Sequence, residues 1–215
     1  MLIEEHTMKK KITLLALFTA MIVFFIPVNA QDTVTRVHRF DLTGIEELEI
    51  NNAVGKIELR LVEGDEMRLE LEIEAQEGFF FRRSRDLDEV HLDIEERNER
   101  ISLSLEEEKV SAYWIIEVPA LAEIDIDMGV GEIDAEIGAS RLDIELGVGE
   151  VDVSAQLAKT GDIDVSSGVG DARIRGAHDV SSSRNVVSED SEGRGEGDFA
   201  IEVEVGVGSA RVTVD

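Results

Sequence analysis

Carboxylate side chains recur at fixed positions in five similar segments of the chain, and carboxylates repeated in this way could bind divalent cations. Each segment centres on a valine followed by glycine. The position five residues before that valine is always acidic: Glu49, Asp125, Asp143, Asp164 and Glu202. The position three residues before it is occupied by Asp127, Glu145 and Glu204, with Asn51 and Ser166 in the other two segments. Loose calcium binding is one interpretation; a merely solvated outer face and adaptation to salty surroundings are the alternatives.

No dedicated catalytic, cofactor-binding or metal site is predicted. Calcium-binding β-rolls carry aspartate two residues after the last glycine of their motif, where this chain has Ile133 and Val151. The Gly-x-Gly segments lack the third glycine of dinucleotide-binding loops. The absence of cysteine excludes thiolate catalysis, zinc–cysteine sites and disulfides. Three histidines after residue 30 lack the spacing of metal ligands: His38, His91 and His178. A non-enzymatic protein is therefore expected.

The charge restricts the partners. The 215 residues include 48 acids and 21 bases, giving a formal net charge of −27. Nucleic acids and anionic membrane surfaces attract proteins through positive charge, so neither is an expected partner. An envelope protein or a glycan is expected instead.

The acids belong to a repeated segment. Gly-Val-Gly occurs at 129–131, 147–149, 168–170 and 206–208, and Ala-Val-Gly at 53–55. Successive valines from Val130 onward are 18, 21 and 38 residues apart, and the last interval is twice 19. Apolar residues alternate on both sides, as in Ile124-x-Ile126-x-Met128 and Ile133-x-Ala135-x-Ile137. Strict alternation is typical of a strand with one buried face.

The alternation shifts by one residue at each valine. The valine is in phase with the apolar residues before it, so it is expected on the buried face. A shift would turn the following apolar residues outward unless the backbone bends there, and glycine tolerates such a bend. Each Gly-Val-Gly is therefore predicted to be a corner between two strands.

Stacking of these units predicts the fold class. We expect an all-β, single-stranded β-solenoid in which strand–corner–strand repeats of about 19 residues enclose an aliphatic core. An antiparallel β-sandwich with regularly spaced hairpins is the alternative.

The rest of the chain departs from the repeat. Residues 31–118 are the N-terminal β-rich part of a single domain, 31–215, and residues 119–215 are its Gly-Val-Gly part. Within the first part, residues 67–118 alternate without the glycine corner and are expected to form wider coils or a flanking sheet that caps the stack. The segment Gly78–Asp86 contains three phenylalanines, expected to cover an open end or to form a patch for a partner. Residues 177–198 are polar and predict a degenerate repeat or a mobile loop.

The first 30 residues are predicted to be a signal peptide. Lys9-Lys10-Lys11 precedes an apolar run from Ile12 to Pro27, and Val28-Asn29-Ala30 provides small residues for cleavage before Gln31. An uncleaved anchor is the alternative. The protein is accordingly expected in the periplasm or at the cell surface, without membrane insertion after cleavage.

The order Trp114–Pro119, Ile124-Asp125-Ile126 and Gly131-Glu132-Ile133-Asp134 resembles a bacterial putative-adhesin family, also described as toast-rack β-solenoids. The resemblance extends over most of residues 37–215. It implies an exported β-solenoid of unknown function, and it brings no catalytic residues with it.

Three functions remain as hypotheses. An exported cell-envelope protein could present its acidic repeat surface for adhesin-like binding or scaffolding. It could instead act in envelope-stress sensing with a membrane partner, or as a polysaccharide-acting β-helix enzyme. Exposed end strands could also pair with another copy to form a homo-oligomer.

Overall fold

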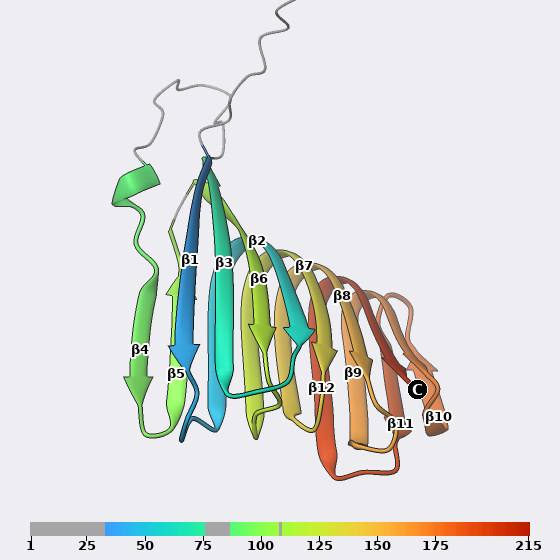
Figure 1. Ribbon diagram of the computed structural model, residues 1–215. Coiled ribbons are helices and arrows are strands. Elements are labelled where there is room, and N and C mark those ends of the chain that lie inside the picture. Colours follow the sequence, from blue (N-terminus) through green and yellow to red (C-terminus); the bar gives the residue numbers. More distant parts are fainter. Residues whose placement is uncertain (1–32, 76–86, 108) are drawn as a thin grey trace, which may run out of the picture. The chain divides into compact units, whose positions relative to one another are not determined.

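The computed structural model describes residues 33–75, 87–107 and 109–215, which form twelve β-strands and one short 3-10 helix without any α-helix (Figure 1). The predicted all-β class is confirmed. The predicted signal peptide and the phenylalanine-containing segment 78–86 lie outside the described residues. The elements are β1 (Thr33–Asp41), β2 (Glu47–Leu61), β3 (Glu66–Ala75), η1 (Leu87–Glu89), β4 (Asp93–Arg97), β5 (Arg100–Leu105), β6 (Val110–Val118), β7 (Glu123–Ile137), β8 (Arg141–Ala155), β9 (Thr160–Arg175), β10 (His178–Arg184), β11 (Glu189–Arg194) and β12 (Phe199–Val214).

The strands belong to one mixed sheet. Its order is β1-β3-β6-β2-β7-β8-β12-β9-β11-β10, with β5 beside β2 and β4 beside β5. The five strands that contain the repeats, β2, β7, β8, β12 and β9, pair in parallel. The alternative of antiparallel hairpins is therefore wrong for the repeats. A closed solenoid is not confirmed either, because the sheet does not close on itself.

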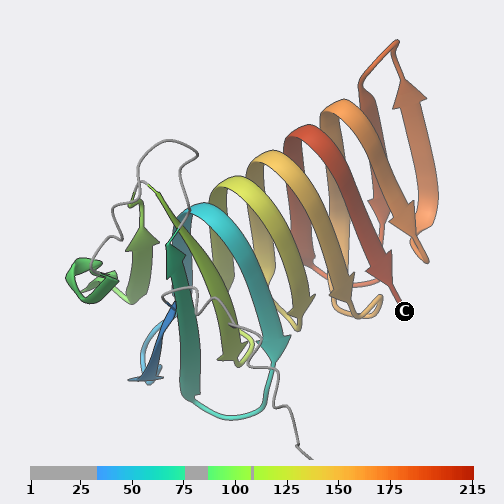
Figure 2. The same cartoon turned by 90° about the horizontal axis from the view of Figure 1, so that it is seen from above.

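Each repeat strand arches at its glycines, as predicted (Figure 2). We call the part before the Gly-Val-Gly or Ala-Val-Gly segment the first arm and the part after it the second arm. Both arms turn their aliphatic side chains into one core between them. In β7 the core residues are at most 4% exposed: Ile124, Ile126 and Met128 in the first arm, and Ile133, Ala135 and Ile137 in the second. Met128 and Ile133 are five positions apart, an odd number, so the predicted phase shift falls in the bend.

The second glycine of each bend is required by both conformation and space. Gly208 has φ 145°, and a Cβ atom there would lie 1.7 Å from the carbonyl oxygen of Gly149 on the neighbouring strand. Gly149 has φ 150°, and its Cβ would lie 1.7 Å from the oxygen of Gly131. Only glycine allows this backbone conformation together with such close stacking.

The prediction that the central valines are buried is wrong. Val130, Val148, Val169 and Val207 are 46–48% exposed, whereas the alternating residues on either side are buried. The backbone turns around the core at the apex of an arch. The valine follows the alternation of the buried residues before it, but the turn directs its side chain to the outer surface. The four valines form an exposed row along the arches, and the architecture rests on the strand register instead.

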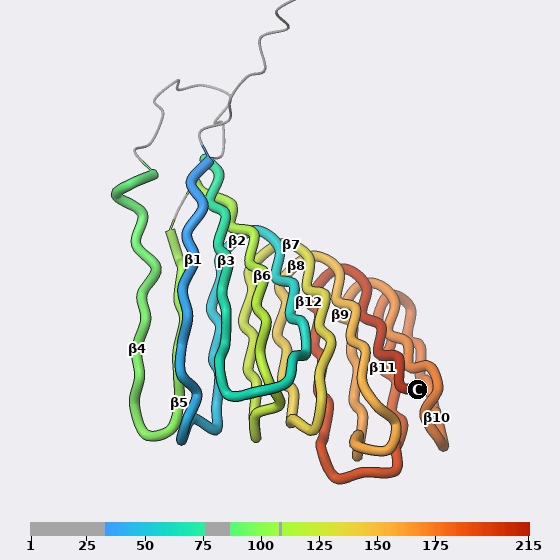
Figure 3. The backbone as a smooth tube through the Cα atoms, in the orientation of Figure 1, coloured from blue at the N-terminus to red at the C-terminus, as the bar shows by residue number. Residues whose placement is uncertain are grey.

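The order of the repeats in space differs from their order in sequence. The C-terminal strand β12 lies between β8 and β9, so the fourth Gly-Val-Gly segment stacks between the second and the third (Figure 3). The polar stretch 177–198 is neither a repeat nor an unstructured loop. It contains the antiparallel pair β10–β11, and β11 pairs with the first arm of β9.

Residues before 119 extend both arms, as the hypothesis of a flanking sheet predicts. The first arm of β2 pairs with β5, and its second arm pairs with β6. Within this part Ile94 is 41% exposed on the edge strand β4, although the alternation places it on a buried face. An edge strand lacks a neighbour on one side, so less of its inner face is covered.

Candidate functional site

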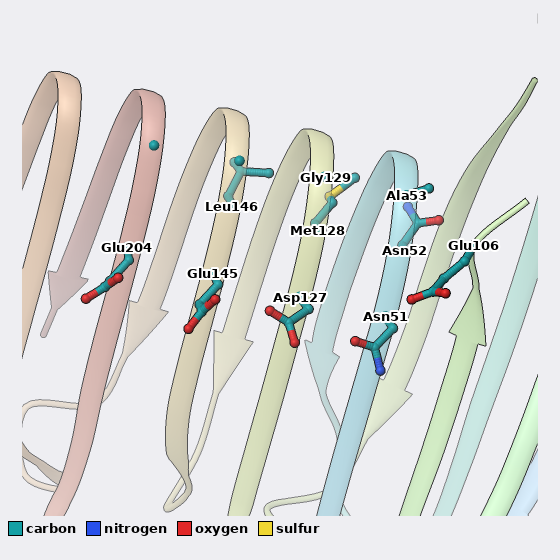
Figure 4. Close-up of a pocket in the computed structure, with 12 residues that line it drawn as sticks. Asn51, Asn52, Ala53, Glu106, Asp127, Met128, Gly129, Glu145, Leu146 and Glu204 are labelled. Carbon is teal, nitrogen blue, oxygen red and sulfur yellow. The ribbon is translucent and has the colours of Figure 1, made fainter. Parts of the chain in front are cut away.

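The predicted acids form two straight rows on the outer side of the first arms, and we call this surface the acidic face. Parallel pairing without a register shift brings equivalent positions side by side on adjacent strands. In spatial order the upstream row is Glu49, Asp125, Asp143, Glu202 and Asp164. The row nearer the bend is Asn51, Asp127, Glu145, Glu204 and Ser166. Figure 4 shows four of these side chains, from Asn51 to Glu204, aligned across successive strands.

Strand β11 extends both rows, which sequence reasoning missed. Its register places Glu192 beside Asp164 and Asp190 beside Ser166. The segment Glu189–Arg194 has no alternating aliphatic residues, since the buried position is taken by Ser191. The hydroxyl of Ser191 donates to the carbonyl oxygen of Ala172, 2.8 Å away. Because the buried position is polar, the sequence pattern did not predict this strand.

Burial and mutual repulsion raise the pKa of several carboxyl groups on the acidic face. Neighbouring strands are about 4.8 Å apart, where two unit charges repel by about 0.9 kcal/mol in bulk water. The pKa of Glu145 is raised, first by the charge of Asp127 and then by burial. The pKa of Asp127 is raised mainly by burial and then by Glu49 and Asp143. Burial and the charge of Glu123 raise the pKa of Asp125.

One end of the acidic face is compensated. Ser102 Oγ donates to Glu49 Oε2 at 2.7 Å, and this hydrogen bond is the main reason why the pKa of Glu49 is lowered. Arg100 Nε lies 2.6 Å from Glu47 Oε2 and its Nη1 lies 3.3 Å from Glu49 Oε2. In the described part of the chain, Asp127, Glu145 and Glu204 make no ion pair or side-chain hydrogen bond. The uncompensated charge therefore lies over β7, β8 and β12.

A shallow depression of about 550 Å³ follows the uncompensated row, between the acids and the bends (Figure 4). Its acidic side chains are Glu106, Asp127, Glu145 and Glu204, and its floor includes Gly129, Gly147 and Gly206. A second depression of about 670 Å³ lies across the bends and is lined by residues including Lys56, Glu132, Glu150, Asp171 and Ser209. In each bend the exposed valine stands in the chain between the residues that line the first depression and those that line the second. The bends therefore place an apolar row of valines next to the acidic row.

On the outer side of the second arms most acids, five of seven, lie in ion pairs. Lys56 Nζ lies 2.7 Å from Glu132 Oε1 and 2.5 Å from Asp134 Oδ2, and these hydrogen bonds raise its pKa. Arg211 Nη1 lies 2.5 Å from Asp152 Oδ1. In the five repeat strands the first arms present eleven outward carboxylates and one arginine: Glu47, Glu49, Glu123, Asp125, Asp127, Asp143, Glu145, Asp162, Asp164, Glu202 and Glu204, with Arg141. The second arms present seven outward carboxylates and five basic side chains. The carboxylates are Glu58, Glu132, Asp134, Glu136, Glu150, Asp152 and Asp171, and the basic side chains are Lys56, Arg60, Arg173, Arg175 and Arg211.

The geometry does not assemble a metal centre. Among residues 33–75, 87–107 and 109–215, no group of three or more potential side-chain ligands is arranged to hold an ion. The acids lie in open rows and do not converge, so the calcium interpretation gains no built site. His38 is half-buried and stacks on Phe40, whereas His91 and His178 are exposed. The three histidines lie on separate segments.

Comparison with solved structures identifies the fold. No protein-family model and no curated protein sequence matches the chain. The structure of a putative cell adhesion protein from Clostridium sporogenes superposes with a TM-score of 0.51 at 14% identity, covering 85% of this chain and 100% of that one. The chain shares the fold of that protein. This likeness agrees with the fold expected from the resemblance to the putative-adhesin family.

Two more distant structures carry similar descriptions. A putative adhesin from Bacteroides fragilis has 11% identity and a TM-score of 0.33 over 83% of this chain and 97% of its own. One from Parabacteroides merdae has 11% identity and a TM-score of 0.34 over 86% and 82%. These scores are too low to support an argument about this chain. Separately, the described residues contain no helical segment with the length and hydropathy of a membrane span.

Proposed function

We propose that the chain is an exported, non-enzymatic binding protein that contacts a positively charged envelope partner through the acidic face. The observation that carries the proposal is the row Asp127, Glu145 and Glu204, which is uncompensated and held at strand spacing on a hydrogen-bonded scaffold. Folding does not require such a row, because the second arms of the same strands carry paired charges. The description of the Clostridium sporogenes protein as a cell adhesion protein supports a binding role.

The surface favours an extended partner with repeated cationic groups. Carboxylates on successive strands repeat at about 4.8 Å, and adjacent valines offer apolar contact along the same direction. A basic segment of a protein could pair its side chains with the row while its apolar stems cover the valines. Polyanions are repelled by the same field. The parallel stacking of the repeat strands gives the row its length.

The experiment compares two triple variants of equal net charge. Asp127→Asn, Glu145→Gln and Glu204→Gln neutralise the acidic face, whereas Glu74→Gln, Glu136→Gln and Glu150→Gln neutralise three acids outside it. Binding of an oligolysine peptide is measured by calorimetry at low salt. Each exposed ion pair contributes about 0.5 kcal/mol, so the first variant, which loses three, should bind about tenfold more weakly and the second should resemble the unmodified chain.

Equal losses in both variants would show that only net charge matters, and the acidic face would not be the site. Added NaCl should weaken oligolysine binding in the unmodified chain, because exposed charges are screened. Neutral oligosaccharides serve as the second probe. Binding to them that survives in the acidic-face variant would replace the basic protein partner with a glycan.

A further inference from the structure

One side chain in the wall of the first depression is buried without any hydrogen bond. Asn52, on the first arm of β2, is 4% exposed, and neither Nδ2 nor Oδ1 of its amide has a partner in the described chain. The other buried polar residues of the described chain all form side-chain hydrogen bonds: Ser140, Thr160, Ser167 and Ser191. A buried amide that has lost water and gained no partner destabilises the fold. Asn52 therefore needs an explanation other than folding.

The architecture does not require an amide at this position. In register with Asn52, the neighbouring strands carry Leu105 on β5 and Met128 on β7. The equivalent residues further along the stack are Leu146 on β8 and Val205 on β12. All four of these side chains are buried in the aliphatic core. A leucine at position 52 would match its neighbours, so the amide replaces an apolar contact.

Asn52 also lies where the row of bends ends. On one side of β2 the ladder with β5 stops at Asn52, and the ladder with β6 begins only at Gly55. Between these positions the bend of β2 has no described strand beside it on that side, whereas on the other side Val54 pairs with Val130 of β7. Strands β5 and β6 are joined by residues 106–109 and not by a glycine bend. The inner position of Asn52 is thus next to the open end of the bends.

The depression places carboxylates on both sides of the amide. Figure 4 shows Asn52 with Asp127 on one side and Glu106 on the other, and all three residues line the depression. An amide offers two N–H donors and one acceptor oxygen. A ligand that satisfies both must present an oxygen acceptor beside an N–H group, and the carboxylates select positive charge near them. A lysine residue within a peptide combines the N–H and C=O groups of the backbone with an ammonium group.

We propose that Asn52 anchors one end of the basic segment bound by the acidic face, by pairing its amide with a peptide group of that segment. This inference rests on the proposed function and adds a fixed point to it. A row of like charges attracts a basic segment in many registers, whereas hydrogen bonds to an amide are directional. A lysine next to the anchored peptide group reaches the carboxylates of Glu106 and Asp127. The side chains that cover the amide must move on binding, as interface side chains commonly do.

The test uses Asn52→Leu, which gives β2 the residue that β8 carries at the equivalent position. Binding of oligolysine is measured by calorimetry at low salt, and stability is measured by thermal melting. Loss of two hydrogen bonds should weaken binding about tenfold. Loss of the unpartnered buried amide should raise the melting temperature by a few degrees. A residue that serves only the fold would not change these two quantities in opposite directions.

Ser167→Ala is the matched control. It removes a buried polar group at the equivalent position of β9, where Ser167 Oγ donates to the carbonyl oxygen of Gly208 at 3.1 Å. It should lower the melting temperature and leave oligolysine binding unchanged. A second measurement is nuclear magnetic resonance of the unmodified chain. The side-chain NH2 signals of Asn52 should shift when oligolysine is added, while those of Asn185, between β10 and β11, should not.

Normal oligolysine binding by Asn52→Leu, or unmoved NH2 signals of Asn52, would overturn this inference. The proposed function would still stand if the triple variant of the acidic face binds oligolysine weakly. An oligolysine that does not bind the unmodified chain would refute both. Should Asn52→Leu fail to fold, the resonance measurement decides alone, because it needs no variant.

Discussion

The first and second arms of each repeat strand have the same backbone and the same kind of core, yet they present opposite surfaces. On the second arms Lys56, Arg211 and their neighbours pair with the acids that they face. On the first arms Asp127, Glu145 and Glu204 lie beside one another and beside further acids, without a cation among their neighbours in the described sheet. Because both arms fold into the same parallel ladder, charge pairing is not a requirement of the architecture. The unpaired carboxylates of the acidic face are therefore not needed for folding.

The bend between the arms should give the largest effect. In Gly208→Ala the new methyl group meets the oxygen of Gly149 at 1.7 Å, and φ 145° is strained for alanine. We expect a loss of about 3 kcal/mol or more in the free energy of unfolding, measured in urea. The control is Gly64→Ala. Gly64 has φ 119° and no atom within 4 Å of the new Cβ, so this variant should lose only the part of the free energy of unfolding that comes from backbone strain. Equal losses at both positions would mean that close stacking at the bend is unimportant.

Removing the paired lysine should make the second arm resemble the first. Lys56→Met leaves Glu132 and Asp134 without their cation. Because the pairs are partly exposed, we expect a loss of about 0.5–1 kcal/mol in the free energy of unfolding at low salt, measured in urea. Lys159→Met, at an exposed turn, is the control. A gain in stability in Lys56→Met would remove the distinction between the arms.

Unpaired and hydrogen-bonded carboxyl groups of the repeat strands should respond to acid in opposite ways. Burial of Asp125 and Asp127 and the repulsion of Glu145 by Asp127 raise the pKa values of these three groups in the fold, so their ionised forms destabilise it and protonation relieves that cost. The melting temperature should therefore rise as the pH falls from 7 to about 5. The lowered pKa values of Glu49 and Glu58 have the opposite consequence, since their stabilisation is lost only as the pH falls through those lowered values.

Calorimetric scans at several pH values check this expectation. In Asp127→Asn with Glu145→Gln, the rise between neutral pH and about pH 5 should be smaller, while the loss at lower pH should remain. An unchanged rise in that variant would assign the effect to other groups.

Salt should have the smallest effect. At 1 M ionic strength the screening length is about 3 Å, shorter than the spacing of the rows, so NaCl should raise the melting temperature by a few degrees. Millimolar calcium at constant ionic strength should add little, because the described acids do not converge on a single point. A large shift with calcium alone would favour a cation site.

Several features of the fold follow from single residues. Alternation at Ile124, Ile126 and Met128 predicts the buried face, and the glycines predict the bend. The exposure of Val130 could not be read from phase alone, because phase assumes that the strand stays straight through the apex. The alignment of the acids follows once the strands are parallel and in register.

The position of β12 could not be predicted from the repeats. The repeat strands offer similar bends and similar aliphatic residues at their edges, so no local signal selects β8 and β9 as its neighbours. The selection comes from the β10–β11 pair, which carries the chain around β9. That pair is hidden in sequence because Ser191 replaces the expected aliphatic residue.

The most direct measurement is the free energy of unfolding of Asp127→Asn with Glu145→Gln and Glu204→Gln, determined in urea at low salt and compared with the unmodified chain. If the row serves binding and not folding, removal of its repulsion should stabilise the protein by about 1 kcal/mol. A loss of stability of the same size would contradict the account, because the carboxylates would then hold the arms together.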